Sequence, residues 1–172
     1  MKITTQTIAA IGILFCLGAC APKSMTESSS DASTYFPIQI GEQLVQLQLA
    51  LSKQEQSKGL MHRGSLKLNH GMLFLFKAPK RQSFWMRNTP LKLDIGYFNA
   101  SGVLMETHSL YPFDETAVKS FSAEILIAIE MKHGWFAKNK VRPGARIDLA
   151  QLKDALRERG RPINDYAVKN SD

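Results

Sequence analysis

The alternation of apolar and polar residues along the chain predicts a domain built mainly from β-strands. Val45, Leu47, Leu49 and Leu51 alternate with Gln46, Gln48 and Ala50, which is typical of a strand with one buried face. Residues 123–131 form the strongest candidate for a buried strand, with Ile125, Ile127, Ile129 and Met131 expected on one face. Further strands are expected at residues 72–76, 81–86, 91–98, 103–110 and 145–149.

Turn and capping signals place short helices and connections between these strands. Ser52 and Glu55 fit the S-x-x-E capping box, so a short helix is expected to begin there and to end near Gly64. A hairpin turn is expected at residues 99–102, one helical turn within 134–140, a turn at 142–144, and a charged helix over 150–159. The sequence therefore predicts an α+β fold: a single compact, mostly antiparallel β-rich domain with two or three short helices. Whether the sheet closes into a barrel is left open.

The N-terminus carries a pattern typical of export. Residues 8–17 are an apolar stretch of ten residues, whereas a helix that spans a bilayer needs roughly 20. The stretch ends in Leu-Gly-Ala followed by Cys20, which resembles the lipobox of bacterial lipoproteins. The resemblance implies that a signal peptide, residues 1–19, is removed and that Cys20 receives the lipid anchor, including palmitate. An ordinary cleaved signal, with Cys20 incidental, and an uncleaved anchoring helix are the alternatives.

Residue composition divides the rest of the chain. Residues 20–35 are rich in Ser and Thr and are expected to form a flexible tether. The β-rich domain is expected over residues 36–160, and residues 161–172 are expected to form a loose C-terminal tail. By resemblance to the Gram-negative sorting rule, Ala21 after the cysteine implies an outer-membrane location facing the periplasm, if the source is Gram-negative.

Charge and cysteine content exclude several function classes. The formal net charge is +7, but the basic residues are interleaved with acidic ones, and an envelope location disfavours nucleic acid as a partner. Both cysteines, Cys16 and Cys20, lie in the export region, so the expected domain has no thiol for a disulfide, a nucleophile or a zinc ligand. The common catalytic motifs are absent and the four histidines lack metal-ligand spacing, so we expect no cofactor and no metal.

Several short segments carry a family resemblance. They read Gly-Leu-Met-His-Arg at 59–63, Gly-Met-Leu-Phe at 71–74, Phe-Trp-Met-Arg-Asn-Thr at 84–89 and Leu-Asp-Ile at 93–95. In this order and spacing they resemble the bacterial and archaeal family named domain of unknown function 192, over roughly residues 38–149. Pro90, Lys92 and Ala145 depart from the family pattern. The resemblance implies a small β-rich domain and assigns no activity.

The polar residues Arg63, Asn88 and Asp94 form the best candidate site. Strand alternation puts Asp94 on the same face as Gly96 and Phe98, where an unpaired carboxylate would be costly. One interpretation is an Arg63–Asp94 ion pair with a turn at Asn88, which would be purely structural.

The same groups admit two functional interpretations. They could line a pocket together with Glu130 and with Trp85 as its aromatic wall, which would bind a small polar or glycan ligand. Alternatively, Asp94 and Glu130 could divide acid and base roles in catalysis.

Two further features have a structural and a functional interpretation. The Gly-Trp-Phe segment at 134–136 would be a ligand platform if exposed, and it would fasten the late strand if buried. The methionines could suit a copper site, but their apolar neighbours favour packing in the core.

The sequence thus predicts an exported, lipid-anchored envelope protein that acts as a non-enzymatic binding or structural module. The alternative is a hydrolase or other enzyme that acts on envelope glycan through Asp94 and Glu130. Its expected partners are the membrane, through the lipid anchor, and an envelope glycan or protein.

Overall fold

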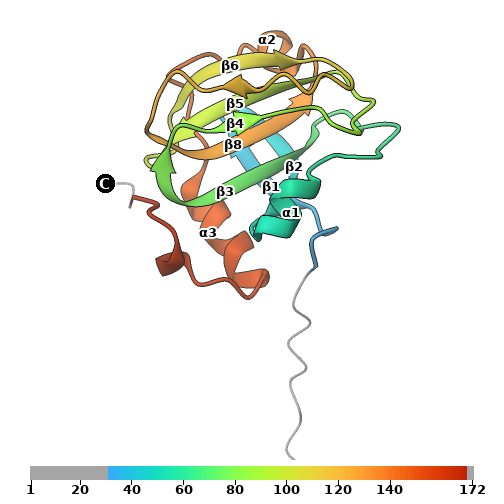
Figure 1. Ribbon diagram of the computed structural model, residues 1–172. Helices are drawn as coiled ribbons and strands as arrows, with labels where there is room; N and C mark the ends of the chain where they lie inside the picture. The colour runs from blue at the N-terminus through green and yellow to red at the C-terminus, as the bar shows by residue number, and fades with distance from the viewer. Residues whose placement is uncertain (1–30, 170–172) are drawn as a thin grey trace, which may run out of the picture.

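A six-stranded sheet organises the domain in the computed structural model, which describes residues 31–169. The strand order is β1-β2-β3-β8-β5-β6, and only β2 and β3 are parallel (Figure 1). A small second sheet pairs β4 with β7. The strands are β1 (Phe36–Ile40), β2 (Gln43–Ala50), β3 (His70–Lys80), β4 (Ser83–Phe84), β5 (Leu93–Asn99), β6 (Leu104–Leu110), β7 (Val118–Lys119) and β8 (Ile125–Lys132). The α+β, mostly antiparallel prediction is confirmed.

Short helices complete the fold, and their caps explain where they begin. They are α1 (Lys53–Lys58), α2 (Trp135–Lys138), α3 (Leu149–Glu158) and the 3-10 turn η1 (Ile163–Asp165). The predicted capping box of Ser52 and Glu55 is present at the start of α1. The helix ends earlier than predicted, because Gly59 takes a φ of +46° and so leaves the helical conformation there.

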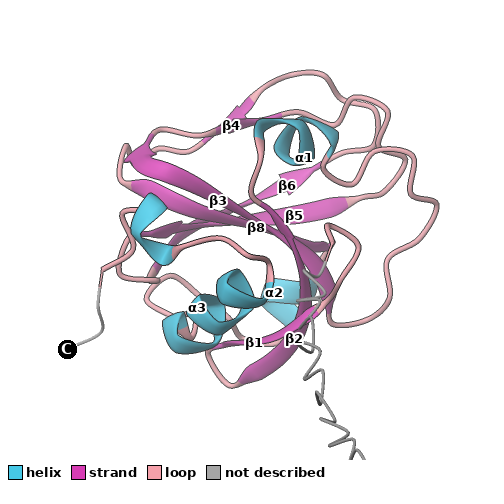
Figure 2. Cartoon of the chain, turned by 90° about the horizontal axis from the view of Figure 1, so that it is seen from below, coloured by secondary structure: helices cyan, strands magenta, loops and turns pink. Residues whose placement is uncertain are grey.

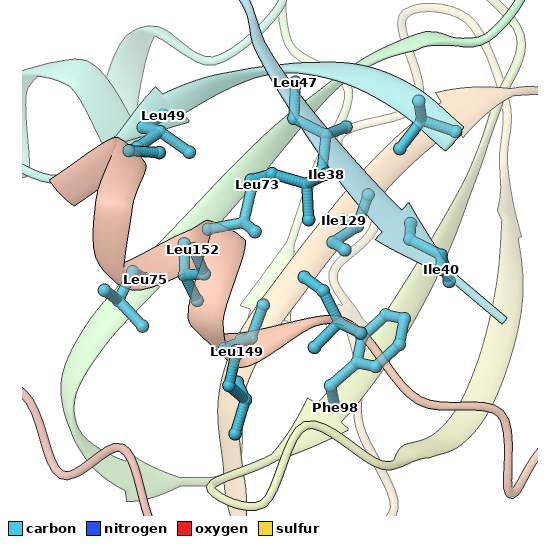
Figure 3. Packing of buried hydrophobic residues seen from close by; sticks show 14 of the residues in the cluster. Ile38, Ile40, Leu47, Leu49, Leu73, Leu75, Phe98, Ile129, Leu149 and Leu152 are labelled. Atoms are coloured by element: carbon cyan, nitrogen blue, oxygen red, sulfur yellow. The ribbon is translucent and has the colours of Figure 1, made fainter. Parts of the chain in front are cut away.

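The sheet has a hydrophobic core on each face. One core lies between the sheet and α3 and contains Ile38, Leu47, Leu73, Ile129 and Leu152 (Figure 3). The other core contains Leu60, Phe74, Met86, Ile95 and Tyr97. Figure 2 shows α2 and α3 on one side of the sheet, with α1 and β4 on the other. Because successive strand residues point to opposite faces, a sheet covered on both sides needs strands that are apolar throughout.

The two edges of the sheet are joined by a connecting segment rather than by direct pairing. The Gly41 N–H donates to the Arg146 carbonyl and the Leu104 N–H donates to the Ala145 carbonyl, both at 2.8 Å. The strand predicted at residues 145–149 is therefore reduced to isolated bridges, at Ile147 with Ile40 and at Arg146 with Val103. Within the described residues the sheet is not a closed barrel.

The predicted face of Ile125 needs correction. Ile125 belongs to the second core, not to the face of Ile127, Ile129 and Met131. The reason is an irregularity where β8 pairs with β3, between Leu75 and Lys80.

The C-terminal segment, expected to be loose, contacts the domain over residues 161–169. Tyr166 is buried in the first core, and the Lys169 N–H donates to the Ala100 carbonyl.

The export region cannot be compared with the structure. The predicted signal peptide, Cys20 and most of the tether lie outside the described residues. Among the helices of residues 31–169, none is both long and apolar enough to cross a bilayer.

Candidate functional site

Asp94 is held by groups that the sequence interpretation did not name. Its carboxylate accepts hydrogen bonds from the Gly134 N–H at 2.7 Å and the Ser109 hydroxyl at 2.9 Å, and it lies 2.8 Å from His133 Nδ1. Asp94 therefore fastens the turn between β8 and α2 to β5. Trp135 and Phe136, which follow this turn, are buried, so the buried interpretation of that aromatic segment is correct.

The arrangement of Asp94, His133 and Ser109 is not a nucleophile relay. In such a relay the serine bonds to the imidazole, and the carboxylate bonds to the opposite ring nitrogen. Here the hydroxyl of Ser109 and the ring of His133 both contact the same oxygen, Oδ1 of Asp94. The cluster therefore satisfies a mostly buried carboxylate and leaves no activated hydroxyl.

Arg63 lies elsewhere, and the predicted Arg63–Asp94 pair is wrong. Its guanidinium donates to the side-chain oxygen of Gln48 and to the Tyr35 hydroxyl. Gln48 is buried and donates in turn to the Ser33 carbonyl at 2.7 Å. Arg63 thus ties the turn after α1 to β2 and to the start of the described chain.

Asn88 has the turn role that was predicted. It is exposed, adopts a φ of +53° and accepts the His62 N–H on its carbonyl at 2.8 Å. Asparagine tolerates this left-handed conformation better than most residues. The turn at Asn88 and the one at His62 are therefore joined, which places the segment that contains Trp85 beside the segment that follows α1.

Glu130 occupies an unusual position in β8. Its neighbours on the adjacent strands are Met72 and Ile95, so its side chain shares their face and points into the second core. The residue is only 4% exposed, and no described residue donates a hydrogen bond to its carboxyl group. Burial raises the pKa of Glu130 to about 8, because an anion is disfavoured in apolar surroundings.

The carboxyl group of Glu130 opens onto a pocket. In residues 31–169, every side-chain oxygen or nitrogen that is fully shut off from solvent has a hydrogen-bond partner. Since Glu130 has none, its carboxyl must be reached through the pocket that it lines, which has a volume of about 330 Å³. Other residues of its wall are Lys53, Gln56, Lys58, Leu60, Met61, Phe74, Phe76, Ser83, Phe84, Trp85 and Thr89.

The pocket combines an aromatic wall with a basic rim. The Phe74 and Phe84 rings meet edge to face, with centroids 4.9 Å apart. Trp85 is 48% exposed at the same wall, and the Arg87 guanidinium carbon lies 5.7 Å from its ring centroid. The exposed residues Lys53 and Lys58 contribute from α1.

The structure therefore brings together only two of the five predicted ligand-binding residues, Trp85 and Glu130. Asp94 is opposite Met131 while Glu130 is opposite Ile95, so the two carboxyl groups project from opposite faces of the sheet. They do not form the acid–base pair that the enzyme alternative requires. A group of three or more His, Cys, Asp or Glu side chains able to hold a metal is not found in the described residues.

Sequence reasoning missed the lysines and phenylalanines of the pocket. They belong to α1, β3 and β4, and no motif or spacing links these elements before the chain folds. The sequence did contain a signal for Glu130 itself, because it is the only charged residue within the apolar run 125–131.

Comparison with solved structures identifies two similar folds. One is a protein from Sinorhizobium meliloti 1021 described as a "putative transcription regulator", with 24% identity and a TM-score of 0.65, covering 69% of this chain and 96% of that one. The other is a protein of unknown function from Novosphingobium aromaticivorans DSM 12444, with 26% identity and a TM-score of 0.64, covering 74% and 99%. At this identity the first likeness supports the fold alone.

Among proteins with curated functions, none matches this chain. A family model does match, over residues 36–149, which is most of the described domain. This chain therefore belongs to the DUF192 family, described as "Uncharacterized ACR, COG1430".

Proposed function

We propose that this protein is an exported envelope lipoprotein, anchored through Cys20, whose domain is a non-enzymatic binding module. Its ligand site is the pocket between α1, β3 and β4, with Trp85 at its wall and Glu130 on the sheet. In a Gram-negative source the module would sit on the outer membrane and face the periplasm. The bound partner would be an envelope glycan or an envelope protein.

The observation that carries the proposal is the unpartnered carboxyl group of Glu130. A polar group buried without a hydrogen bond destabilises the fold, and an apolar side chain at this position would not have that cost. Perturbed ionisable groups that face a pocket are enriched at functional sites. Since the carboxyl faces an open pocket with an aromatic wall, its natural partner is a group on a ligand.

Binding is favoured over catalysis by what surrounds Glu130. General acid–base chemistry needs a second group within hydrogen-bond reach of the reacting atoms. The other titratable residues that line the pocket are Lys53 and Lys58, which are exposed on α1. The Asp94 carboxylate, the second acid of the enzyme alternative, projects from the other face of the sheet.

The test is recovery of bound small molecules and glycans from envelope extract, using the full-length protein in detergent and mass spectrometry. Trp85→Ala should reduce recovery of the ligand about tenfold, because a stacking contact of this kind contributes roughly 1 kcal/mol or more. Phe121→Ala removes another exposed aromatic ring outside the pocket and serves as the matched control. Equal recovery by wild type, Trp85→Ala and Glu130→Ala would rule out this pocket as the binding site.

A further inference from the structure

The residues that line the pocket restrict the chemical class of its ligand. The other charged residues that line the pocket are Lys53 and Lys58 on α1. Tyr97 on β5 also interacts with Glu130, because its pKa is raised first by burial and then by the Glu130 charge. No described residue donates a hydrogen bond to Glu130, and Tyr97 directs its own hydroxyl to the Val118 carbonyl. Below about pH 8 the Glu130 carboxyl is therefore mainly uncharged.

An uncharged carboxyl group has one O–H donor and one carbonyl acceptor. It suits a ligand hydroxyl or amide group, which can both donate and accept. An ammonium group would instead require the ionised form, which the apolar surroundings disfavour. The inner end of the ligand should therefore be polar and uncharged.

The exposed rim of the pocket, unlike its inner end, favours a charged group on the ligand. Lys53 and Lys58 are exposed lining residues, and Arg87 adds a third positive charge beside Trp85. Glu130 is the only acidic residue among those that line the pocket. A ligand with a negative charge at its outer end would be attracted to this rim, and a cationic ligand would be repelled.

The same pocket has an aromatic wall. Trp85 is half exposed and can offer a ring face to a flat apolar surface, such as the C–H face of a sugar ring. Ser83, Gln56 and Thr89 add polar atoms to the same lining. The volume of about 330 Å³ lies at the lower end of the range for small-molecule sites, roughly 300 to 1,000 Å³.

We propose that the pocket binds an acidic saccharide, with its ring against Trp85, a hydroxyl group toward Glu130 and its carboxylate toward Lys53 and Lys58. This inference names the ligand class of the proposed function and depends on that function. It adds a specificity that the fold and the family do not assign.

The test compares three trisaccharides that differ in charge: galacturonic acid, galactose and glucosamine. Binding to the full-length protein in detergent is measured by isothermal titration calorimetry at pH 6.5 and pH 9. At pH 6.5 the galacturonic acid trisaccharide should bind about tenfold more tightly than the galactose trisaccharide, because each exposed charge pair adds a modest attraction. The double variant Lys53→Gln, Lys58→Gln should lose that preference.

The pH arm tests the role of Glu130. Only about one carboxyl in ten stays protonated at pH 9 if its pKa is about 8, so wild-type affinity should fall about tenfold from its value at pH 6.5. Glu130→Gln keeps an uncharged donor and acceptor, so it should bind at pH 6.5 and lose this pH dependence. The same behaviour in wild type and Glu130→Gln at both pH values would overturn the assigned role.

Two results would overturn the ligand class. Tighter binding of the glucosamine trisaccharide than of the galacturonic acid trisaccharide at pH 6.5, lost in Glu130→Gln, would make Glu130 the counter-ion of an amine. The absence of binding by all three trisaccharides at millimolar concentration would refute a saccharide ligand. In either case the recovery experiment with Trp85→Ala still decides separately whether the pocket binds a ligand.

Discussion

At the residue scale, Glu130 is a buried polar side chain whose burial destabilises the fold. It stands in a strand that is otherwise apolar, between Met72 and Ile95 of the neighbouring strands. Asp94 is also mostly buried, yet it accepts hydrogen bonds from Ser109 and Gly134 and therefore supports the fold. The contrast is between a carboxyl group that stabilises the fold and one that the fold leaves without a hydrogen-bond partner.

Glu130→Gln should raise stability at neutral pH. The pKa of Glu130 rises from an ordinary value of 4.5 to about 8 on folding. At pH 7 the native state therefore holds a proton that the unfolded chain has released, and stability falls as pH rises from about 4.5 to about 8. The variant escapes this penalty and should be more stable by up to about 3 kcal/mol at pH 7, with almost no gain at pH 4.

Urea unfolding of both proteins at pH 4 and pH 7 measures this difference. The control is Glu124→Gln, which neutralises an exposed residue just before β8 and should change stability by less than about 0.5 kcal/mol. A Glu130→Gln effect that is the same at both pH values would contradict the assigned cause.

At the element scale, Glu55 connects α1 to the C-terminal helix. Its carboxylate accepts the Leu51 and Ser52 N–H groups at the start of α1, and it pairs with Arg159 just after α3 at 2.6 Å. Burial alone would raise the pKa of Glu55, but the hydrogen bonds from Ser52, Leu51 and Arg159 outweigh it and lower the pKa. Arg159 also donates to the Leu49 carbonyl at 2.8 Å, so α3 is fastened to β2.

Arg159→Met should therefore destabilise the domain by about 2 kcal/mol, because it removes charge-assisted hydrogen bonds from a buried site. The contribution of Glu55 is present at neutral pH and is lost as pH falls through its lowered native pKa, so the effect should shrink in acid. Urea unfolding at pH 7 and pH 3 measures both quantities. Arg157→Met removes an exposed ion pair with Asp154 and is the control. An equal loss of stability in the two variants would contradict a stabilising role of the buried Arg159 contacts.

At the scale of the whole molecule, α1 and β4, which contribute residues to the pocket, lie on the other side of the sheet from α3 (Figure 2). Changes in the pocket can therefore be made without touching the first core. If Cys20 bears the lipid, the stretch between Cys20 and Ser33, whose carbonyl is bound by Gln48, limits the reach of the domain to about 45 Å from the membrane. The domain would then bind its proposed ligand close to the membrane that holds the anchor.

Cys20→Ser tests the proposed anchor. The variant should lose labelling by radioactive palmitate and should be released from membranes, because it lacks the acyl chains that give stable binding. Cys16→Ser changes the other cysteine, inside the predicted signal peptide, and should keep the label. Labelling of Cys20→Ser at the wild-type level would refute the lipobox interpretation.

Local pattern was sufficient for most elements of the fold. Alternation at Val45, Leu47 and Leu49 predicted β2, and the Ser52–Glu55 pair predicted the start of α1. The turn at residues 99–102 was also predicted, and there the Asn99 side chain accepts the Ser101 and Val103 N–H groups at 3.0 Å. These features depend on residues only a few positions apart, so their physical causes are contained in short stretches of sequence.

The partners of the polar residues were decided by the tertiary structure alone. Asp94 meets His133, 39 residues later, and Arg63 meets Gln48 and Tyr35, because distant turns converge on them. Glu130 and Trp85 line one pocket only after the crossover through α1 and the pairing of β4 with β7 have brought their segments together. By itself the sequence determined most of the helices and strands and contained Glu130 as a charged residue within an apolar strand. The folded chain decided that this carboxyl group opens onto an aromatic pocket, because long-range strand pairing sets which faces meet.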